Sequence, residues 1–505
     1  MSDTVDKLMQ QLRSEFRRIW GYEDFRPPQG EIAFSLLTGQ DALVVMPTGG
    51  GKSVCFQLPA LLRGGLTIVV SPLVALMENQ VQELRQLQLP AQLLHGEVDK
   101  KQRLQTLRDI EQNQLRLLYL SPETLLSPVV WQCLSAPQVQ ITGMILDEAH
   151  CLVQWGETFR PAYRRLGVVR RALLASKPSG TKISMAAFTA TADPEALRVI
   201  EKVLQLQRPE KFLLSVYRSN LHLAVKTVFT PRGRRQQLLK FIGTQGKTSG
   251  LVYARSRQDT EDLARWLREK GYQTNAYHAG LSAPERRRIE QAWLGDRLQF
   301  VVCTSAFGMG VNKPNVRWVV HYQAPGMLSE YVQEAGRAGR DGFPAIALTL
   351  ASEPTGLLEP ADRQRWRLLN QQQQQLMQRA TQLGRKLPQT GEVTKLTQEF
   401  PDAAVALSLL HSAGVLEWRD PFRYQMLSIP GGKQEKEPGG KSIATGTRQG
   451  MRNPVSGCYP AKQIAEYLYN RQCRWQYLLR AFGFGEHLPC GHCDNCRSSH
   501  QPTVR

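Results

Sequence analysis

The chain has 505 residues, of which 42% are hydrophobic and 21% are charged, a balance typical of a soluble globular protein with several domains. It has no run of about 18 uncharged apolar residues, and its first twenty residues lack the apolar core of a secretory signal. We therefore exclude a membrane-spanning protein and expect a cytoplasmic location, nucleoid-associated if the organism is a bacterium. Lys and Arg outnumber Asp and Glu by 64 to 44, and the formal charge of +20 favours nucleic acid as partner over a merely basic soluble protein.

Short apolar runs separated by stretches of helical length predict an α/β fold with two tandem parallel sheets. We place the two units at residues 1–210 and 211–355. The strands expected in the first unit are residues 42–46, 67–71, 115–120, 143–147 and 183–190. Those expected in the second unit are residues 249–254, 273–278, 298–304, 316–322 and 345–350.

The first predicted strand leads directly into MPTGGGKS, residues 46–53. The glycines let backbone N–H groups face one anion, and the start of the following helix adds partial positive charge. Lys52 can reach the β and γ phosphates, and the Ser53 hydroxyl can ligate Mg²⁺. The usual first glycine is replaced by Met46, so this is a variant phosphate loop. The alternative, a tight glycine turn with a chance Lys-Ser, fits the strand–loop–helix context poorly. The ATP-binding candidates here are Pro47, Thr48, Gly49, Gly50, Gly51, Lys52 and Ser53.

Two adjacent acids, Asp147 and Glu148, follow another predicted strand. Open parallel sheets bind their ligands at the carboxyl ends of the strands. Asp147 can hold Mg²⁺ and Glu148 can polarise an attacking water. The alternative reading for a lone Asp-Glu pair is a solvated loop.

The same stretch, LDEAHCLVQWGETFRPAY, continues into Trp155, Phe159, Arg160 and Tyr163. Rings next to a guanidinium can stack on the bases of a single strand and contact its phosphates. A buried aromatic loop is the structural alternative.

Residues 356–428 differ in character and predict a small α+β unit. Residues 362–386 indicate a helix with a solvated glutamine face, and 392–428 suggest two helices and a hairpin, an order similar to a winged helix. A hairpin near Arg419, Phe422 and Arg423 could contact duplex DNA, although a packing role is an equal alternative. Residues 429–457, rich in Gly, Pro, Lys and Ser, predict a flexible linker.

Residues 458–505 contain four closely spaced cysteines, Cys473, Cys490, Cys493 and Cys496. Four thiolates at such spacing predict a closed tetrahedral Zn²⁺ site. His487 and His492 are weaker candidates for ligands, and Cys458 is expected to be spare. Disulfides are disfavoured in the reducing cytoplasm, where we expect this protein.

MPTGGGKS followed by DEAH (147–150) resembles a superfamily 2 helicase, and CLVQWGETFRPAY narrows the resemblance to the RecQ family of DNA helicases. The resemblance extends from residue 22 to residue 496, nearly the whole chain. Its other motifs are FRPPQ (25–29), SPLVALMENQ (71–80), TAT (189–191), SAFGMGVNKPNVR (305–317) and QEAGRAGRDG (333–342).

This resemblance implies two RecA-like lobes with ATP between them. It implies that Gln29 hydrogen-bonds the edge of the adenine, with Tyr22 and Arg26 nearby in the nucleotide-binding site. Trp155 and Phe159 are expected to bind DNA, with Arg160 meeting a phosphate or the nucleotide-side network. The residues implied to be catalytic are Lys52, Asp147, Glu148, His150, Gln333, Arg337 and Arg340. Arg337 and Arg340 are three apart, which on one helical turn gives them a common face, and the family places that face opposite the phosphate loop.

The implied activity is ATP- and Mg²⁺-dependent unwinding of DNA with 3′ to 5′ polarity, on single-stranded and on tailed or forked substrates, in DNA repair or recombination. The Zn²⁺ is expected to be structural. One alternative is a DNA-stimulated translocase or annealing factor with weak unwinding. Another is a passive nucleic-acid clamp, which the complete set of catalytic residues argues against.

The chain departs from the family at three positions near the rings. Glu157 stands where His is usual, Val153 where Ser is usual, and Thr158 where Asp is usual. Glu157 is expected to repel phosphate unless paired, which would weaken the coupling of ATP hydrolysis to unwinding. The family also often places a winged helix after the zinc module, whereas residues 392–428 precede it here.

Overall fold

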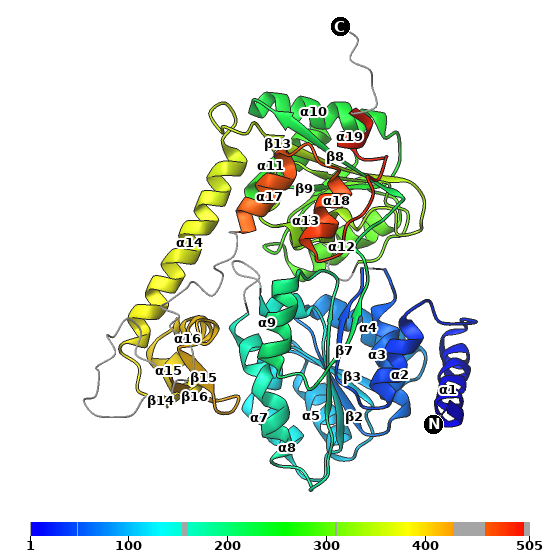
Figure 1. The fold of residues 1–505 in the computed structure, drawn as a ribbon, viewed down its shortest axis with the longest axis vertical. Coiled ribbons are helices and arrows are strands. Elements are labelled where there is room, and N and C mark those ends of the chain that lie inside the picture. The colour runs from blue at the N-terminus through cyan, green and yellow to red at the C-terminus, as the bar shows by residue number, and fades with distance from the viewer. Residues whose placement is uncertain (1, 48, 154–159, 309–310, 428–459, 499–505) are drawn as a thin grey trace.

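The computed structural model describes residues 2–47, 49–153, 160–308, 311–427 and 460–498. Two lobes lie one above the other, and two smaller parts are attached to them (Figure 1). The predicted linker at 429–457 lies outside the described residues. No helix within the described residues is both long and apolar enough to cross a membrane.

Lobe 1 is built on a seven-stranded parallel sheet in the order β3-β4-β2-β5-β6-β1-β7. Its strands are β1 Ala42–Val45, β2 Leu66–Val70, β3 Ala91–Leu94, β4 Leu117–Leu120, β5 Ile141–Leu146, β6 Ser184–Thr189 and β7 Glu210–Leu213. Its helices are α1 Ser2–Trp20, α2 Gln29–Leu37, α3 Lys52–Leu62, α4 Val74–Gln86, α5 Lys100–Glu111, α6 Pro122–Leu125, α7 Pro128–Ser135, α8 Val169–Leu174 and α9 Pro194–Leu204. Two 3₁₀ segments, η1 Ala149–Leu152 and η2 Pro161–Val168, follow β5.

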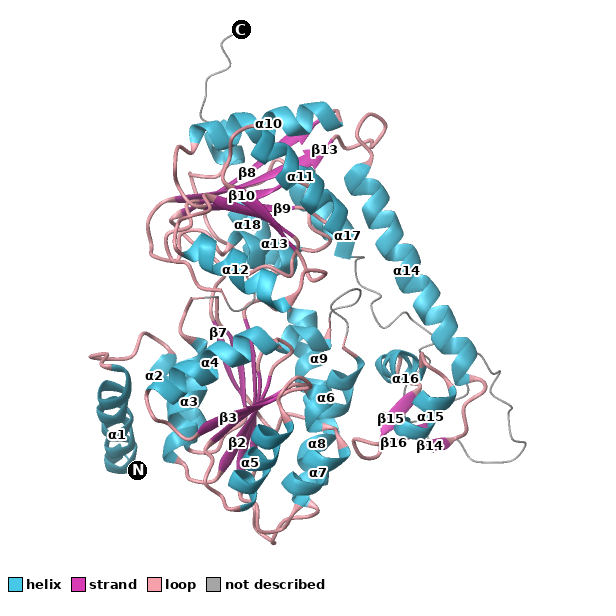
Figure 2. Cartoon of the chain, turned by 180° about the vertical axis from the view of Figure 1, so that it is seen from behind, coloured by secondary structure: helices cyan, strands magenta, loops and turns pink. Residues whose placement is uncertain are grey.

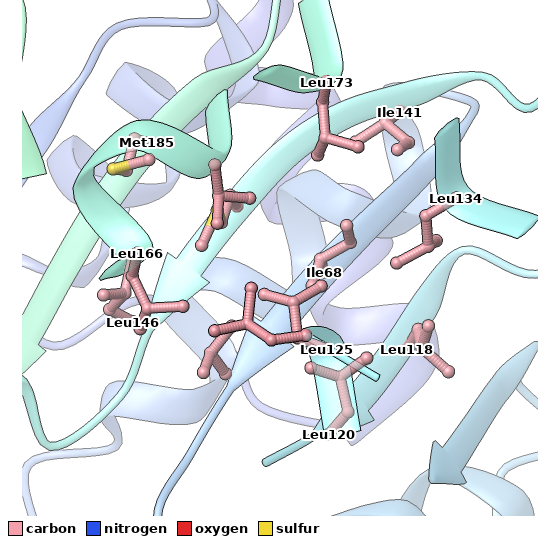
Figure 3. Packing of buried hydrophobic residues seen from close by; sticks show 14 of the residues in the cluster. Ile68, Leu118, Leu120, Leu125, Leu134, Ile141, Leu146, Leu166, Leu173 and Met185 are labelled. Atoms are coloured by element: carbon pink, nitrogen blue, oxygen red, sulfur yellow. The ribbon is translucent and has the colours of Figure 1, made fainter. Parts of the chain in front are cut away.

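The lobe 1 strands are continuous apolar runs because both faces of the sheet are covered. Every residue of β2 is buried, yet Ile68 and Val70 join one apolar cluster while Val69 joins the cluster on the opposite face. Figure 3 shows the first of these clusters, where Ile68 lies among Leu118, Leu125 and other leucines. All five predicted strands of this lobe are present.

Two lobe 1 strands were not predicted. β3 has only four residues, and β7 is polar and largely exposed. β7 pairs in parallel with β1 through Ala42 and Glu210, so the sheet of lobe 1 extends past the predicted boundary at residue 210.

Lobe 2 has a six-stranded parallel sheet in the order β10-β11-β9-β12-β13-β8. Its strands are β8 Leu221–Val228, β9 Gly250–Tyr253, β10 Thr274–Tyr277, β11 Phe300–Cys303, β12 Trp318–His321 and β13 Ala345–Ser352. Its helices are α10 Pro231–Thr244, α11 Arg257–Glu269, α12 Ala283–Leu294 and α13 Leu328–Ala335. The five predicted strands are present, and β8, whose burial alternates irregularly, was not predicted.

An arm leaves lobe 2 and runs alongside lobe 1 (Figures 1 and 2). It consists of the long helix α14, Ala361–Gly384, and a tip formed by residues 385–427. The tip contains α15 Val393–Glu399, α16 Ala403–Ser412 and an antiparallel sheet in the order β14-β16-β15. Its strands are β14 Thr390–Glu392, β15 Leu416–Trp418 and β16 Arg423–Met426. The predicted helices and hairpin are confirmed, with β14 as an additional strand.

The C-terminal module comprises α17 Pro460–Tyr469, α18 Arg474–Ala481 and α19 Asp494–Ser498. Its buried residues belong to the same apolar cluster as lobe 2. The Trp475 indole donates to the Leu221 carbonyl at 3.2 Å, and the Val225 amide donates to the Asp494 carboxylate at 2.8 Å. The predicted class, two parallel-sheet units with a small α+β unit and a C-terminal cysteine module, is therefore confirmed.

Candidate active site and metal centre

The predicted phosphate loop joins β1 to α3, which begins at Lys52. Gly49 and Gly51 have φ angles of 87° and 75°, a region that residues with a side chain rarely adopt. A Cβ on Gly51 would also collide with the Gln29 amide nitrogen. The loop therefore needs these glycines. A pocket between the lobes, called the cleft from here on, is lined by Pro47 and Thr191 of lobe 1 and by Arg218 and Gln333 of lobe 2. The loop delivers the N-terminus of α3 to this cleft as an anion-binding end. Pro47 and Gly50 lie in the loop and Ser53 lies in the first turn of α3, while Thr48 lies outside the described residues.

Three charged side chains meet beneath this loop. Lys52 Nζ lies 3.8 Å from Glu148 Oε1, and His150 Nδ1 lies 3.1 Å from Glu148 Oε2. The Lys52 ammonium is buried and has no hydrogen-bond partner among the described residues. Glu148 itself has a φ of 52°, a strained conformation for a residue with a side chain. Lys52 and His150 on either side fix its carboxylate at the edge of the sheet.

The two adjacent acids are shifted in opposite directions. Burial raises the pKa of Asp147 to about 6, and the neighbouring Glu148 charge adds to this effect. Burial also acts to raise the pKa of Glu148, but the charge of Lys52 and the contact with His150 bring it down to about 2. Glu148 is thus held ionised by the protein, whereas ionised Asp147 calls for a further cation. Ser53 follows Lys52 at the start of α3, and its hydroxyl and the Asp147 carboxylate are oxygen donors of the kind that Mg²⁺ prefers.

His150 connects the acids to lobe 2. Burial lowers its pKa, but its neighbours Cys151 and Glu148 raise it, to about 10. Its Nε2 atom lies 3.5 Å from Gln333 Nε2, and Gln333 also donates to Thr191 Oγ1 at 3.3 Å. Gln333 of α13 therefore contacts two lobe 1 motifs directly.

Arg337 and Arg340 do not share a helical face, which corrects the prediction. Helix α13 ends at Ala335, and both arginines lie in the turns that follow. Arg337 donates to the Gly308 carbonyl, and Arg340 donates to Asn312 Oδ1 at 3.0 Å. They are nevertheless on the cleft side, because a Cβ on Gly49 would lie 3.5 Å from Arg340 Cδ.

Three arginines concentrate positive charge on the lobe 2 side of the cleft. Burial lowers the pKa of Arg340 to about 10, and the charges of Arg337 and Arg218 act in the same direction. Grouping buried cations is unfavourable until an anion arrives. A polyphosphate between this face and Lys52 would relieve that repulsion.

A buried ion-pair network behind the cleft was not predicted. Arg255, in the turn after β9, donates to both carboxylate oxygens of Glu334 at 2.9 and 2.7 Å and to Glu330 at 2.8 Å. Burial alone would raise the pKa of Glu334, but Arg255 lowers it to about 2. His321 Nε2 lies 3.2 Å from the same carboxylate. Both acids are on α13, so Arg255 fixes the helix whose end leads to Arg337 and Arg340.

Of the residues expected at the adenine, Gln29 lies beside the phosphate loop. Gln29 is buried, accepts from the Arg26 amide at 2.9 Å and donates to the Gly50 carbonyl at 3.0 Å. Tyr22 is 57% exposed and lies 5.4 Å, ring to ring, from Phe16. Gln29 therefore links this segment directly to the loop that would hold the phosphates.

Of the three residues of the DEAH stretch expected to bind DNA, Trp155, Phe159 and Arg160, the structure describes Arg160. Its guanidinium lies 3.5 Å from the Glu123 carboxylate, in an exposed ion pair. Trp155 and Phe159 lie outside the described residues, as does Glu157. Tyr163, the third ring of the stretch, is fully buried in lobe 1.

The four predicted cysteines come together in the C-terminal module. The sulfur atoms of Cys473, Cys490, Cys493 and Cys496 all lie within 4.8 Å of one another. Cys490 and Cys496 are 3.9 Å apart and Cys473 and Cys493 are 4.0 Å apart, too far for disulfides. Sulfurs around a tetrahedral Zn²⁺ are separated by about 3.8 Å, given a Zn–S bond of about 2.3 Å. The cluster thus fits zinc, with backbone amides of Cys490 and Cys493 donating to sulfur at 3.3 Å.

Three family models match the chain. Residues 26–199 match the DEAD/DEAH box helicase model, residues 233–342 the helicase conserved C-terminal domain, and residues 456–497 the RecQ zinc-binding model. The last match contains all four clustered cysteines.

Curated relatives match over most or all of the chain. An ATP-dependent DNA helicase RecQ of Synechocystis is 50% identical over 96% of this chain and 98% of its own length. An ATP-dependent DNA helicase RecQ of Haemophilus influenzae is 41% identical over 69% of this chain, and the match spans 53% of that longer relative.

Solved structures share the fold at low identity. S. cerevisiae Dbp5 bound to RNA and ADP BeF3 has a TM-score of 0.55 at 17% identity, covering 70% of this chain and 91% of Dbp5. Mycobacterium smegmatis Lhr bound to ssDNA and AMP-PNP has a TM-score of 0.55 at 20% identity, covering 82% and 60%. At such identities these structures support the two-lobed fold alone.

Proposed function

The chain belongs to the RecQ family of ATP-dependent DNA helicases, and from this premise we propose how its residues divide the reaction and which DNA it unwinds. ATP would bind between the lobes, with its phosphates at Lys52 and the start of α3. When bound, Mg²⁺ would neutralise phosphate charge, held by Ser53 and Asp147. Tyr22, Arg26 and Gln29 would contact the base.

Glu148 would orient and polarise the attacking water. Its low pKa keeps it able to accept a hydrogen bond, and its position between Lys52 and His150 fixes its direction. Arg337 and Arg340 would leave their present carbonyl and amide partners for the γ-phosphoryl oxygens, where charge is greatest in the transition state.

The observation that carries this assignment is the contact between the lobes. Gln333 reaches Thr191 and His150, while Arg340 faces Gly49. Groups on both sides of the cleft thus converge on one volume, as a reaction that closes and opens the cleft requires.

Single-stranded DNA would bind across both lobes, with Trp155 and Phe159 stacking on bases and Arg160 nearby. We propose 3′ to 5′ movement on tailed and forked duplexes, in DNA repair or recombination, in the cytoplasm. The family resemblance and the net charge of +20 support this.

The test is strand displacement on duplexes with either a 3′ or a 5′ single-stranded tail, with ATP hydrolysis measured in the same samples. We expect displacement from the 3′ tail and hydrolysis stimulated by single strands. Stimulated hydrolysis without displacement would favour a translocase or annealing factor, the outcome that Glu157 would explain. Hydrolysis at one rate with and without DNA would contradict the proposal.

A further inference from the structure

Helix α14 is buried at its two ends and exposed between them. Its buried residues are Asp362 and Trp366 near the start, and Ala380 and Gly384 near the end. The run Gln371 to Gln375 in the middle is mostly exposed. With 24 residues the helix is about 36 Å long. Such a helix bridges two attachment points, and neither lobe covers its exposed middle.

The base of α14 is fixed to lobe 2. The Trp366 indole donates to the Pro325 carbonyl at 3.1 Å, and the Asp362 carboxylate accepts from the Ala324 and Ser352 amides at 2.9 and 2.7 Å. Next to them, Arg365 Nη1 donates to the backbone carbonyl of Arg255 at 2.8 Å.

This last contact joins the arm to the arginines of the cleft. The side chain of Arg255 holds Glu330 and Glu334 of α13, and the chain continues from α13 to Arg337 and Arg340. Two hydrogen-bonded steps therefore separate α14 from the catalytic arginines.

The tip of the arm is fixed to lobe 1. Phe422 packs edge-on against Trp131 with 5.3 Å between ring centroids. Arg165 donates to the Pro421 carbonyl at 3.2 Å, and Arg171 donates to the Arg419 carbonyl at 2.7 Å. Phe422 and Arg419, the hairpin residues considered for DNA contact, thus lie against lobe 1.

The tip is a folded body rigidly joined to the helix. Its own core includes Leu407, Trp418 and Tyr424 and takes in Val168 from η2 of lobe 1. A second cluster packs α14 against α16 through Ala380 and Leu409. A force on the tip is therefore carried by α14 without passing through a loop.

We propose that the arm, residues 361–427, is a strut that holds the two lobes at a set separation, and that Arg255 is the positioning residue linking it to the arginines. The matched helicase C-terminal domain ends at residue 342 and the zinc-binding match begins at 456, so the arm lies between them. The docked tip coexists with Gln333 at Thr191 and Arg340 at Gly49. The strut therefore favours the closed cleft, and wide opening requires the tip to leave lobe 1. Its effect on hydrolysis rests on the proposed function.

The first test lowers the stiffness of the strut and leaves the contacts at both of its ends unchanged. Gln372→Pro breaks the helix in its exposed middle, while Gln372→Ala keeps it and serves as the matched control. We expect Gln372→Pro to lower kcat for ATP at saturating single-stranded DNA by about threefold to tenfold, since the closed population that hydrolyses ATP falls. Unchanged kcat in a folded Gln372→Pro variant would overturn the proposal.

A second readout needs no ATP. Small-angle scattering of the nucleotide-free protein should show a broader distance distribution for Gln372→Pro than for Gln372→Ala. An identical distribution for both variants would refute the strut. If the wild type hydrolyses no ATP with DNA, the proposed function fails while this measurement still decides the strut.

The two ends are tested separately. Phe422→Ala should raise hydrogen exchange in residues 161–168 and 416–426 and lower kcat as Gln372→Pro does. Leu357→Ala, at a side chain 83% exposed, is the control for removing an exposed apolar side chain.

Arg255→Lys keeps the charge but loses the paired hydrogen bonds, and should lower kcat without altering KM. A rise in KM with normal kcat would assign Arg255 to binding and exclude the positioning role.

Discussion

The two faces of the nucleotide cleft solve the problem of buried charge differently. On lobe 1, Lys52, Glu148 and His150 offset one another within one small cluster. On lobe 2, Arg337 donates to a backbone carbonyl and Arg340 to an amide side chain, but the Nε atom of each has no hydrogen-bond partner among the described residues. Their charges also act on each other unfavourably. Lobe 1 is thus arranged to bind phosphate and metal in the ground state, whereas lobe 2 gains most when negative charge builds up.

The largest expected effect is on the lobe 1 face. Lys52→Ala should reduce ATP hydrolysis by about a thousandfold or more, because the phosphates lose their direct cation. Binding of a fluorescent single strand should persist, since the residue faces the nucleotide. Lys100→Ala, on the exposed start of α5, is the control. Loss of DNA binding together with hydrolysis would mean that Lys52 supports the fold instead.

A substitution on the lobe 2 face of the cleft should change kcat for ATP hydrolysis. Arg340→Ala is expected to lower kcat by about a thousandfold while KM for ATP changes little, because the guanidinium acts on transition-state charge. Steady-state hydrolysis with saturating DNA measures both constants, with the exposed Arg268→Ala as control. An equal rise in KM would remove the distinction between the faces.

Loss of zinc should lower the stability of lobe 2 more than that of lobe 1. Cys493→Ser removes one thiolate from a cluster that shares the lobe 2 core, so the melting temperature should fall by several degrees or more. Zinc released on unfolding, measured with a chromogenic chelator, should fall in parallel, with Cys133→Ser as the buried-cysteine control. Equal stability with and without bound zinc would contradict a structural role.

The smallest effect is a pH dependence on the lobe 1 face. The pKa of Asp147 is raised to about 6 in the folded protein, above its ordinary value. Ionised Asp147 therefore costs stability above pH 6, and this cost disappears as the pH falls toward 4. Because Mg²⁺ needs the ionised form, its affinity should fall by up to about tenfold per pH unit below pH 6. Titration of Mg²⁺ at pH 5 and pH 7 tests this, and Asp147→Asn should abolish the difference.

Features encoded by neighbouring residues could be predicted from the sequence. Lys52 and its glycines occupy one loop, Asp147 and Glu148 adjoin one apolar strand, and three of the zinc cysteines fall within seven residues. In each case spacing alone brings the groups together, whatever the rest of the fold does.

Features that depend on packing between distant segments could not be predicted. Arg255 and Glu334 meet because β9 and α13 adjoin in lobe 2, and Phe422 meets Trp131 because a long helix carries the tip across. Strand β7 was missed because an edge strand with exposed polar side chains lacks the apolar signal. The end of α13 at Ala335 likewise separates Arg337 and Arg340 from the helical face that their spacing suggested.

The contact between Val225 and Asp494 has a consequence for synthesis on the ribosome. The strand β8 receives its partner carboxylate from a segment 269 residues later. As the polypeptide emerges, lobe 1 can complete its sheet early, but the second lobe keeps an unfinished apolar surface until the cysteine module has been translated and metallated. Nascent chains stalled before that point should therefore be the ones that chaperones retain.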